Sequence, residues 1–339
     1  MKIQNEHIQA IKQFGYTERE ARLLYIVAIH SGYFTQNHVR QFSGTRSGRT
    51  VSAFIKRALL HGHLKETKHQ NNARVYQLTY KPLYAAIGRE NLRNRREHSF
   101  DYIKTKLACL DFILNHFGFD YFEGEADKVQ YFEERFQIRP QEMPGKTYKG
   151  ANRVPDTIRY FVDKFPMFLD SARQAVPVAT LTYIDPGIGH LTDFKTHLEA
   201  YSGFLKRLPR FRFIYAGPST IFCGKAERVF KEAVETPTGQ LSSQLARYFS
   251  LRSAWDAKQY ASLSNSDIEF LNHAKQCFAG EPFESAYKKW QAGSLNEKQL
   301  VAEIENRSHR KQEIEFRTCL LPRDYSSFGQ NSKVAGKAA

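Results

Sequence analysis

The sequence predicts a mixed α+β fold, and three patterns lead to this prediction. Residues 35–79 alternate helical and strand-like patterns around a glycine-containing turn. Residues 96–117 carry apolar side chains at helical spacing throughout. Residues 157–235 alternate runs rich in β-branched and aromatic residues with amphipathic runs, which is typical of an α/β unit.

The first helix with a clear start signal begins after Thr17. Thr17 and Glu20 have the spacing of a capping box, in which each side chain accepts a hydrogen bond from the other residue's backbone N–H. The helix that follows presents Ala21, Leu24, Tyr25, Ala28 and Ile29 on one face. Thr35 is expected to cap the next helix, whose Val39 and Phe42 point inward.

The second helix of residues 35–79 carries the functional prediction. Val51, Phe54, Ile55, Ala58 and Leu59 recur at three- and four-residue spacing and predict one buried face. His61-Gly62 is expected to close the helix as a glycine cap. Small polar and basic residues fall away from the buried face near the helix start, where a recognition helix touches base edges in the DNA major groove. The predicted contacts are Arg46, Ser47, Arg49, Thr50, Ser52 and Lys56.

Two short strands joined by a polar tip follow this helix and predict a wing. Basic and amide side chains lie along the strands and at the tip, as in a hairpin that grips the DNA backbone or minor groove. His61 and His63 flank the wing, and we expect them to face DNA or solvent. The predicted wing contacts are Lys65, Lys68, Asn71, Asn72 and Arg74. Helix, turn, helix and wing together predict a winged helix-turn-helix at residues 1–88.

The charge distribution agrees with a nucleic-acid partner. The formal net charge is +15, and residues 1–100 hold 17 Lys and Arg against 6 Asp and Glu, a net of +11. Basic charge therefore collects on the predicted winged module, as expected of a domain that binds a polyanion. We also expect a fragment ending near Gly118 to bind DNA by itself.

Residues 89–118 predict a linking or dimerisation helix. Phe100, Ile103, Leu107, Leu110 and Leu114 alternate spacings of three and four, as in a coiled-coil seam. Tyr102, Phe112 and Ile113 widen this surface, so the helix could pair with a second copy or pack against its own chain. Many helix-turn-helix proteins bind paired half-sites as dimers, which favours a homodimer.

Beyond Gly118 the patterns change. We expect a small α/β domain at 119–236, a helical region at 237–325 and a flexible tail at 326–339. Strands are predicted at 157–165, 176–185 and 211–217, with helices at 191–208 and 226–234. Residues 139–155 are rich in Pro and Gly and predict a long loop. A charged helix is predicted at 296–316.

This order of parts resembles the replication-relaxation family of bacterial mobile-element proteins. The matching pieces are Pro155-Asp156 before a strand, a strand ending in Asp185, and a helix that carries Lys195 and Tyr201. The resemblance implies an N-terminal winged helix followed by a domain similar to restriction endonucleases. It therefore raises a nuclease alternative, in which Asp156 and Asp185 hold a metal ion and Lys195 lies near the attacking water. Tyr183 and Asp185 stand where such a site needs an acid and a lysine, so we expect a degenerate, endonuclease-like domain without activity.

Other signatures of chemistry are missing from the sequence. It has no phosphate-binding loop and no Gly-x-Ser-x-Gly turn, and its four cysteines are isolated from one another. We therefore expect no metal, no cofactor, no membrane partner and a cytoplasmic, nucleoid-associated location. The predicted function is sequence-specific binding of double-stranded DNA, in regulation of transcription or plasmid replication on a mobile element. A protein partner on the C-terminal half and a metal-dependent nuclease or nickase guided by the winged helix are the further alternatives.

Overall fold

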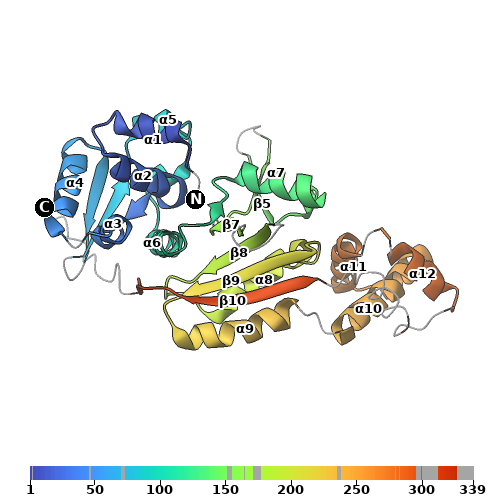
Figure 1. The fold of residues 1–339 in the computed structure, drawn as a ribbon. Coiled ribbons are helices and arrows are strands. Elements are labelled where there is room, and N and C mark those ends of the chain that lie inside the picture. The colour runs from blue at the N-terminus through green and yellow to red at the C-terminus, as the bar shows by residue number, and fades with distance from the viewer. Residues whose placement is uncertain are drawn as a thin grey trace, which may run out of the picture. The chain divides into compact units, whose positions relative to one another are not determined.

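The chain forms a mixed α+β structure, as the sequence predicts (Figure 1). The computed structural model describes residues 1, 3–45, 47–69, 73–150, 155–163, 165–170, 177–234, 238–278, 280–281, 283–294, 299 and 312–326. Two compact units are present. The first comprises Met1–Thr196, Arg210–Glu227 and Ile314–Ala339, and the second comprises His197–Pro209 and Arg228–Glu313.

The N-terminal part of the first unit has the predicted order of helices and strands. Its three-stranded antiparallel sheet has the order β1-β3-β2. The predicted capping box is confirmed, because Thr17 N donates to Glu20 Oε2 at 2.8 Å and Glu20 N donates to Thr17 Oγ1 at 3.3 Å. The elements are α1 (Asn5–Lys12), α2 (Glu18–Ile26), the π-helical turn η1 (Val27–Ser31), β1 (Tyr33–Phe34), α3 (Gln36–Ser43), α4 (Gly48–Leu60), β2 (Leu64–Lys68), β3 (Arg74–Leu78) and α5 (Lys81–Ala86).

Helix α6 (Phe100–Asn115) lies in the middle of the first unit and is preceded by the 3₁₀ turn η3 (Arg93–Arg95). It contacts η1, α3 and β1 on one side and β8 on the other (Figure 1). Leu107 and Leu110 of the predicted seam are completely buried in a core that continues into the neighbouring sheet. Much of the seam is therefore used inside this chain, and the predicted dimer gains no support from it.

A five-stranded sheet with the order β10-β9-β8-β7-β4 forms the other half of the first unit's core. Antiparallel pairing joins β4 to β7 and β7 to β8, whereas β8 and β9 are parallel and are connected through a helix. This parallel connection is the α/β unit that the sequence predicts. The elements are β4 (Asp120–Tyr121), α7 (Glu125–Phe136), β7 (Met167–Asp170), β8 (Val178–Ile184), α8 (Leu191–Leu205), β9 (Arg210–Gly217), α9 (Thr220–Val234) and β10 (Glu313–Leu320).

Two predictions between residues 139 and 165 are wrong. The expected loop contains the 3₁₀ turn η4 (Pro140–Glu142) and β5 (Gly145–Tyr148), which pairs with β6 (Thr157–Tyr160) in a separate two-stranded sheet. The expected strand 157–165 ends at Tyr160, because Phe161 adopts a positive φ of 49°. Asp163 then accepts a hydrogen bond from Phe165 N at 3.2 Å, which turns the chain into β7.

The prediction of a charged helix at 296–316 is also wrong for its C-terminal residues, because Glu313 to Phe316 lie in β10. Pairing at both ends fixes this strand beside β9, with Glu313 N donating to Pro209 O and Leu321 N to Gly217 O. Arg212 of β9 also pairs with Glu315 at 2.6 Å. Tertiary pairing therefore decides the conformation of a segment whose charges suggest a helix. Most of the remaining predicted helix lies outside the described residues.

The second unit is mainly helical in its described part, as predicted. Ser264 and Asp267 form a capping box at the start of its second helix. The unit has its own core, to which Tyr248, Leu271 and Tyr287 contribute from three different helices. These elements are α10 (Thr238–Asp256), the 3₁₀ turn η5 (Tyr260–Ser262), α11 (Asn265–Cys277) and α12 (Phe283–Gln291). Among the described residues, no helix combines the length and the apolar character needed to cross a membrane.

Candidate nucleic-acid interface

The turn between α3 and α4 is built by local signals. Helix α3 ends at Gly44, whose φ of 60° lies in the left-handed region that glycine adopts easily. Helix α4 begins after Ser47, which occupies the N-cap position with an extended backbone. A Cβ at Gly48 would meet nothing within 4 Å, so the first turn of α4 is open to an approaching ligand. Helix N-termini attract phosphate groups through their free N–H groups and dipole.

Helix α4 ends as the sequence predicts. Gly62 has a φ of 68°, His63 N donates to Ala58 O at 2.9 Å, and Gly62 N donates to Leu59 O at 3.0 Å. These two bonds form a Schellman motif, which satisfies carbonyl groups that the helix end would otherwise leave unpaired. The length and end of the helix are therefore fixed by its own sequence.

The two faces of α4 separate as predicted. Val51, Phe54, Ile55 and Ala58 are buried, and Leu59 packs against the same core. Ala53 and Leu60 are exposed in positions that continue the outer face, and Leu60 is 85% exposed. Of the predicted contacts, Ser47, Arg49, Thr50 and Lys56 are exposed, Ser52 is half-buried, and Arg46 lies outside the described residues.

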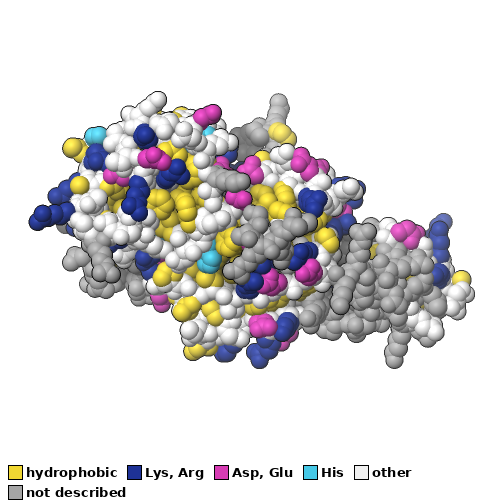
Figure 2. Space-filling view, viewed as in Figure 1, with side chains coloured by type: hydrophobic (Ala, Val, Ile, Leu, Met, Phe, Trp, Pro, Cys, Tyr) yellow, Lys and Arg dark blue, Asp and Glu magenta, His cyan; other side chains and the backbone are white. Residues whose placement is uncertain are grey.

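Arg57 also lies on α4, but unlike its basic neighbours it contacts side chains of other elements of the chain. Its guanidinium pairs with Glu20 at 2.5 Å and lies 5.5 Å from the centre of the Tyr16 ring. These contacts hold α4 against the start of α2. Helix α4 is therefore held in place on its inner side, and its outer face presents Arg49 and Lys56. Lys and Arg side chains also protrude over α4 at the left edge of Figure 2.

The hairpin of β2 and β3 forms the predicted wing, and Lys65, Lys68 and Arg74 are all exposed on it. Lys65 pairs with Glu97, and Arg74 pairs with Glu66 at 3.1 Å. The bond from Lys65 lowers the pKa of Glu97. Both basic groups are thus partly neutralised in the absence of DNA, and a phosphate would have to compete with these carboxylates. Asn71 and Asn72 of the tip lie outside the described residues.

The structure adds two arginines that the sequence analysis did not select. A shallow depression beside the α3–α4 turn is lined by Asn37, Arg40, Gln41, Gly44, Thr45 and Arg323. Arg40 is exposed on α3, and its position opposite the inward-facing Val39 was a usable sequence signal. Arg323 follows β10 and reaches Gln41 at 3.1 Å, a contact between residues 282 positions apart that no local pattern could indicate.

The prediction that His63 faces DNA or solvent is wrong, whereas His61 is exposed. His63 is 5% exposed, and its Nδ1 lies 2.6 Å from the hydroxyl of Tyr16. Its ring also lies against Tyr80, with 4.3 Å between ring centres. His63 is therefore a structural residue behind α4, because the Schellman turn directs it inward.

The residues of the nuclease alternative do not form an open site. Asp185 is 2% exposed, and its Oδ1 accepts bonds from Gly187 N at 2.8 Å and Gly189 N at 3.3 Å. Its Oδ2 accepts a bond from the hydroxyl of Tyr215 at 2.8 Å. These bonds occupy the carboxylate in shaping the loop after β8. Asp156 is exposed before β6 in the separate two-stranded sheet, and Lys195 is exposed on α8.

Asp156, Asp185 and Lys195 therefore lie on three different segments, and of the three only Asp185 is buried. Asp193, the nearest acid in the sequence after Asp185, caps α8 by accepting a bond from His190 N at 2.9 Å. Among the described residues, no group of three His, Cys, Asp or Glu side chains is arranged to hold a metal ion.

Comparisons with models of known families, with curated proteins and with solved structures give no match to this chain. The resemblance to the replication-relaxation family therefore remains a hypothesis that rests on short motifs.

Proposed function

We propose that this protein binds double-stranded DNA in a sequence-specific way through α4, with the β2–β3 hairpin as a wing. The main observation behind the proposal is that α4 has two different sides. One face of the helix is buried, and its open N-terminal turn presents Ser47, Arg49 and Thr50. A recognition helix needs both features, since it must be rigid and must reach base edges with its first turns.

Arg49, Thr50 and Lys56 lie seven residues or less apart on the exposed part of α4. Arginine can donate two parallel hydrogen bonds to a guanine edge, so Arg49 is the proposed reader of sequence. Lys56 and Lys68 are the proposed phosphate contacts. Arg40 extends this surface onto α3, the helix that crosses the DNA backbone in helix-turn-helix complexes.

We propose a regulatory role, in transcription or in replication of a bacterial mobile element, rather than catalysis. The hydrogen-bonded state of Asp185 supports a non-enzymatic α/β part, since metal-dependent cleavage needs carboxylates that are free to bind the ion. The mobile-element context rests on the resemblance described above. A homodimer would suit a palindromic site and stays part of the proposal.

The experiment is selection of genomic DNA fragments by the full chain, followed by anisotropy titration of the enriched sequence. Wild type should prefer this sequence over a scrambled one, and Arg49→Ala should weaken binding and lose preference at one base pair. Lys225→Ala is the matched control, since Lys225 is exposed on α9 away from the proposed interface. No enrichment of any sequence, or an unchanged profile for Arg49→Ala, would disprove the role given to α4.

A further inference from the structure

A cavity lies in the first unit between the winged module and the segment that runs from α7 to the start of β7, away from α4. It has a volume of about 150 Å³. Its walls come from η1, the segment that contains η3, α6, the start of α7, β6 and the turn before β7. The cavity is smaller than the roughly 300–1,000 Å³ of typical cofactor sites, but it is well above the roughly 10–15 Å³ that a single water needs. It would fit a small ligand.

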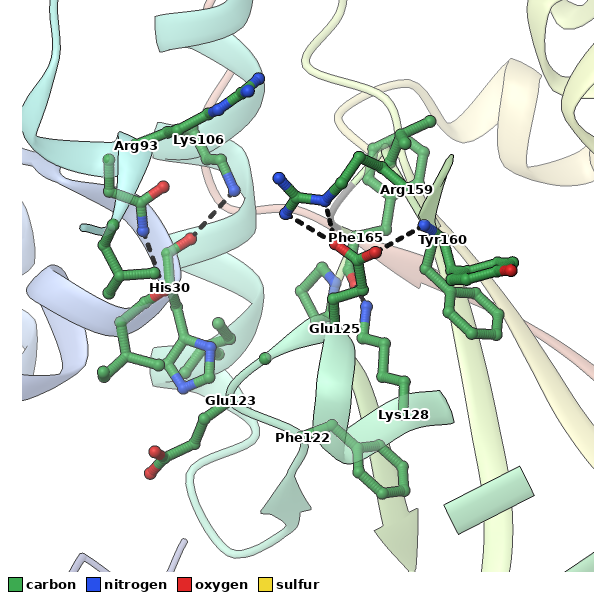
Figure 3. Close-up of a pocket in the computed structure, with 18 of the residues that line it drawn as sticks. His30, Arg93, Lys106, Phe122, Glu123, Glu125, Lys128, Arg159, Tyr160 and Phe165 are labelled. Atoms are coloured by element: carbon green, nitrogen blue, oxygen red, sulfur yellow. Dashed lines mark hydrogen bonds and ion pairs between the residues drawn. The ribbon is translucent and has the colours of Figure 1, made fainter. Parts of the chain in front are cut away.

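Two lysines with buried stems face this cavity. Lys106 is 3% exposed and donates to His30 O at 3.3 Å, and Lys128 is 7% exposed and donates to Phe165 O at 3.2 Å. Figure 3 shows Lys106 reaching in from one wall, while Lys128 and Arg159 approach from the other. An ammonium group carries three N–H donors, so each lysine can donate two more bonds.

The charges around these lysines leave the cavity positive. Arg93, Lys106, Lys128 and Arg159 line it, against the two acids Glu123 and Glu125. Both acids are already engaged. Glu125 pairs with Arg159 at 2.6 Å, and Glu123 accepts bonds from Tyr25 at 2.6 Å and Arg89 at 3.2 Å. Among the described residues, Lys106 and Lys128 each donate to a backbone carbonyl, and Asp163 is the acid whose field acts on both of them.

The surroundings of the two ammonium groups disfavour their charged form. Lys106 lies 5.6 Å from the ring centre of Tyr102, and Lys128 lies 5.7 Å from that of Phe161. Burial lowers the pKa of Lys106, and burial lowers the pKa of Lys128 to about 8 against the opposing field of Asp163. Two cations held in one poorly solvated space are unfavourable unless an anion joins them.

We propose that this cavity is a binding site for a small oxyanion of the phosphate class, held between Lys106 and Lys128. The free N–H groups of the two lysines supply the bonds, and Arg93, exposed at the rim, supplies a third cation. A dianion with several acceptor oxygens matches four spare lysine donors better than a single carboxylate does. The site is independent of the DNA-binding proposal, since none of its lining residues belongs to α4 or to the β2–β3 hairpin.

The test is calorimetric titration of inorganic phosphate into the full chain at pH 7 in a chloride buffer. We expect one saturable site, with sulfate also binding and acetate binding at least tenfold more weakly. Lys106→Met and Lys128→Met should each weaken phosphate at least tenfold. Both variants should stay folded, since methionine removes a buried charge and keeps the volume of the stem. Circular dichroism and the melting temperature check this.

Two controls separate this cavity from other basic surfaces. Lys225→Met removes an exposed lysine of α9, and Arg49→Ala removes the cation nearest the open end of α4. The dissociation constant of both variants for phosphate should stay within about twofold of the wild-type value, which is a difference of less than about 0.5 kcal/mol in binding free energy. Absence of saturable binding up to about 10 mM phosphate would overturn the proposal. Unchanged affinity in folded Lys106→Met and Lys128→Met, or equal loss in Arg49→Ala, would overturn it as well.

Discussion

The imidazole of His38 on α3 and the carboxylate of Asp111 on α6 lie 3.0 Å apart, and neither side chain is exposed. Thr35 N donates to Nδ1 of His38 at 3.0 Å, so Nε2 carries the proton and donates to Asp111. Asp111 also accepts bonds from Arg323 and, at 2.7 Å, from the hydroxyl of Tyr325. One buried carboxylate therefore joins α3 of the proposed DNA-binding module to α6 and to the segment after β10.

Replacing Asp111 should destabilise the first unit strongly. Asp111→Ala leaves Arg323, Tyr325 and His38 without their shared acceptor in a buried position. Removal of one partner of a buried pair typically costs about 3–5 kcal/mol, and we expect the lower end because Arg323 is 23% exposed. Urea unfolding followed by circular dichroism measures the change.

Asp101→Ala is the matched control for this change, since Asp101 lies on the same helix and its side chain is 75% exposed. Its loss should alter the free energy of unfolding by less than about 0.5 kcal/mol. Equal effects of the two substitutions would show that the buried cluster adds nothing to stability.

Stability should fall as the pH decreases below 6.5. Burial lowers the pKa of His38 and lowers the pKa of His30 to about 3, so both stay neutral in the folded chain while the unfolded chain takes up protons. The unfolded state therefore gains free energy of protonation from pH 6.5 downward. The carboxyl groups whose pKa is lowered, such as Glu97 and Glu284, add to this loss only below about pH 4.5.

Thermal melts between pH 8 and 4.5 test this dependence. In His30→Gln the decrease in melting temperature between pH 6.5 and 4.5 should be smaller than in wild type, because one of the histidines whose pKa is lowered by burial is gone. His190→Gln before α8, whose histidine is exposed, should behave as wild type. A flat profile for wild type would contradict the buried neutral state of both residues.

DNA affinity should fall steeply with salt, because basic charge dominates the proposed interface. Each phosphate contact contributes about one unit to the slope of log affinity against log salt. Lys56→Ala should therefore reduce this slope by about one and lower the affinity for all DNA sequences alike. Arg49→Ala should instead lower the binding free energy for the preferred sequence by about 1–3 kcal/mol. Anisotropy titrations at several salt concentrations distinguish the two. An unchanged slope in Lys56→Ala would remove it from the phosphate contacts.

The fragment ending near Gly118 is no longer expected to bind DNA as a folded domain. It would expose Phe112, which is completely buried and lies 6.2 Å from Phe168 of β7 between ring centres. It would also lose Arg323 and Tyr325 from the Asp111 cluster. We expect this fragment to show no cooperative melting transition. A sharp transition close to that of the full chain would show that the winged module folds alone.

Asp185 and Asp156 should respond differently to substitution, although the nuclease alternative gives them one role. Asp185→Ala should lower stability by about 1–3 kcal/mol, because Gly187, Gly189 and Tyr215 lose a buried acceptor. Asp156→Ala should have little effect, since Asp156 is exposed and accepts one bond, from Gly150 N at 3.0 Å. Neither should change cleavage of supercoiled plasmid with Mg²⁺ or Mn²⁺, because wild type should cut nothing. Metal-dependent cleavage lost in both variants would favour the enzyme.

The sequence by itself determined the features whose causes lie within a few residues. Residue spacing and local hydrogen bonds explain the capping box of Thr17 and Glu20, the two faces of α4 and the turn at Gly62. Strands β8 and β9 were also predictable, because their sequences are rich in β-branched and aromatic residues. The exposed positions of Arg49 and Lys56 followed from the same spacing as the buried face.

Only the tertiary structure decided what those faces pack against. The spacing of Leu107 and Leu110 showed that α6 has an apolar face, but a second copy and the chain's own sheet are equally apolar partners. Asp111, Lys106 and Lys128 resemble surface residues in the sequence, and they are buried because their partners come from η1, the turn before β7 and the segment beyond β10. Contacts across more than two hundred residues, such as Arg323 with Asp111, leave no periodic signal, since periodicity records burial within one element and not the identity of its partner.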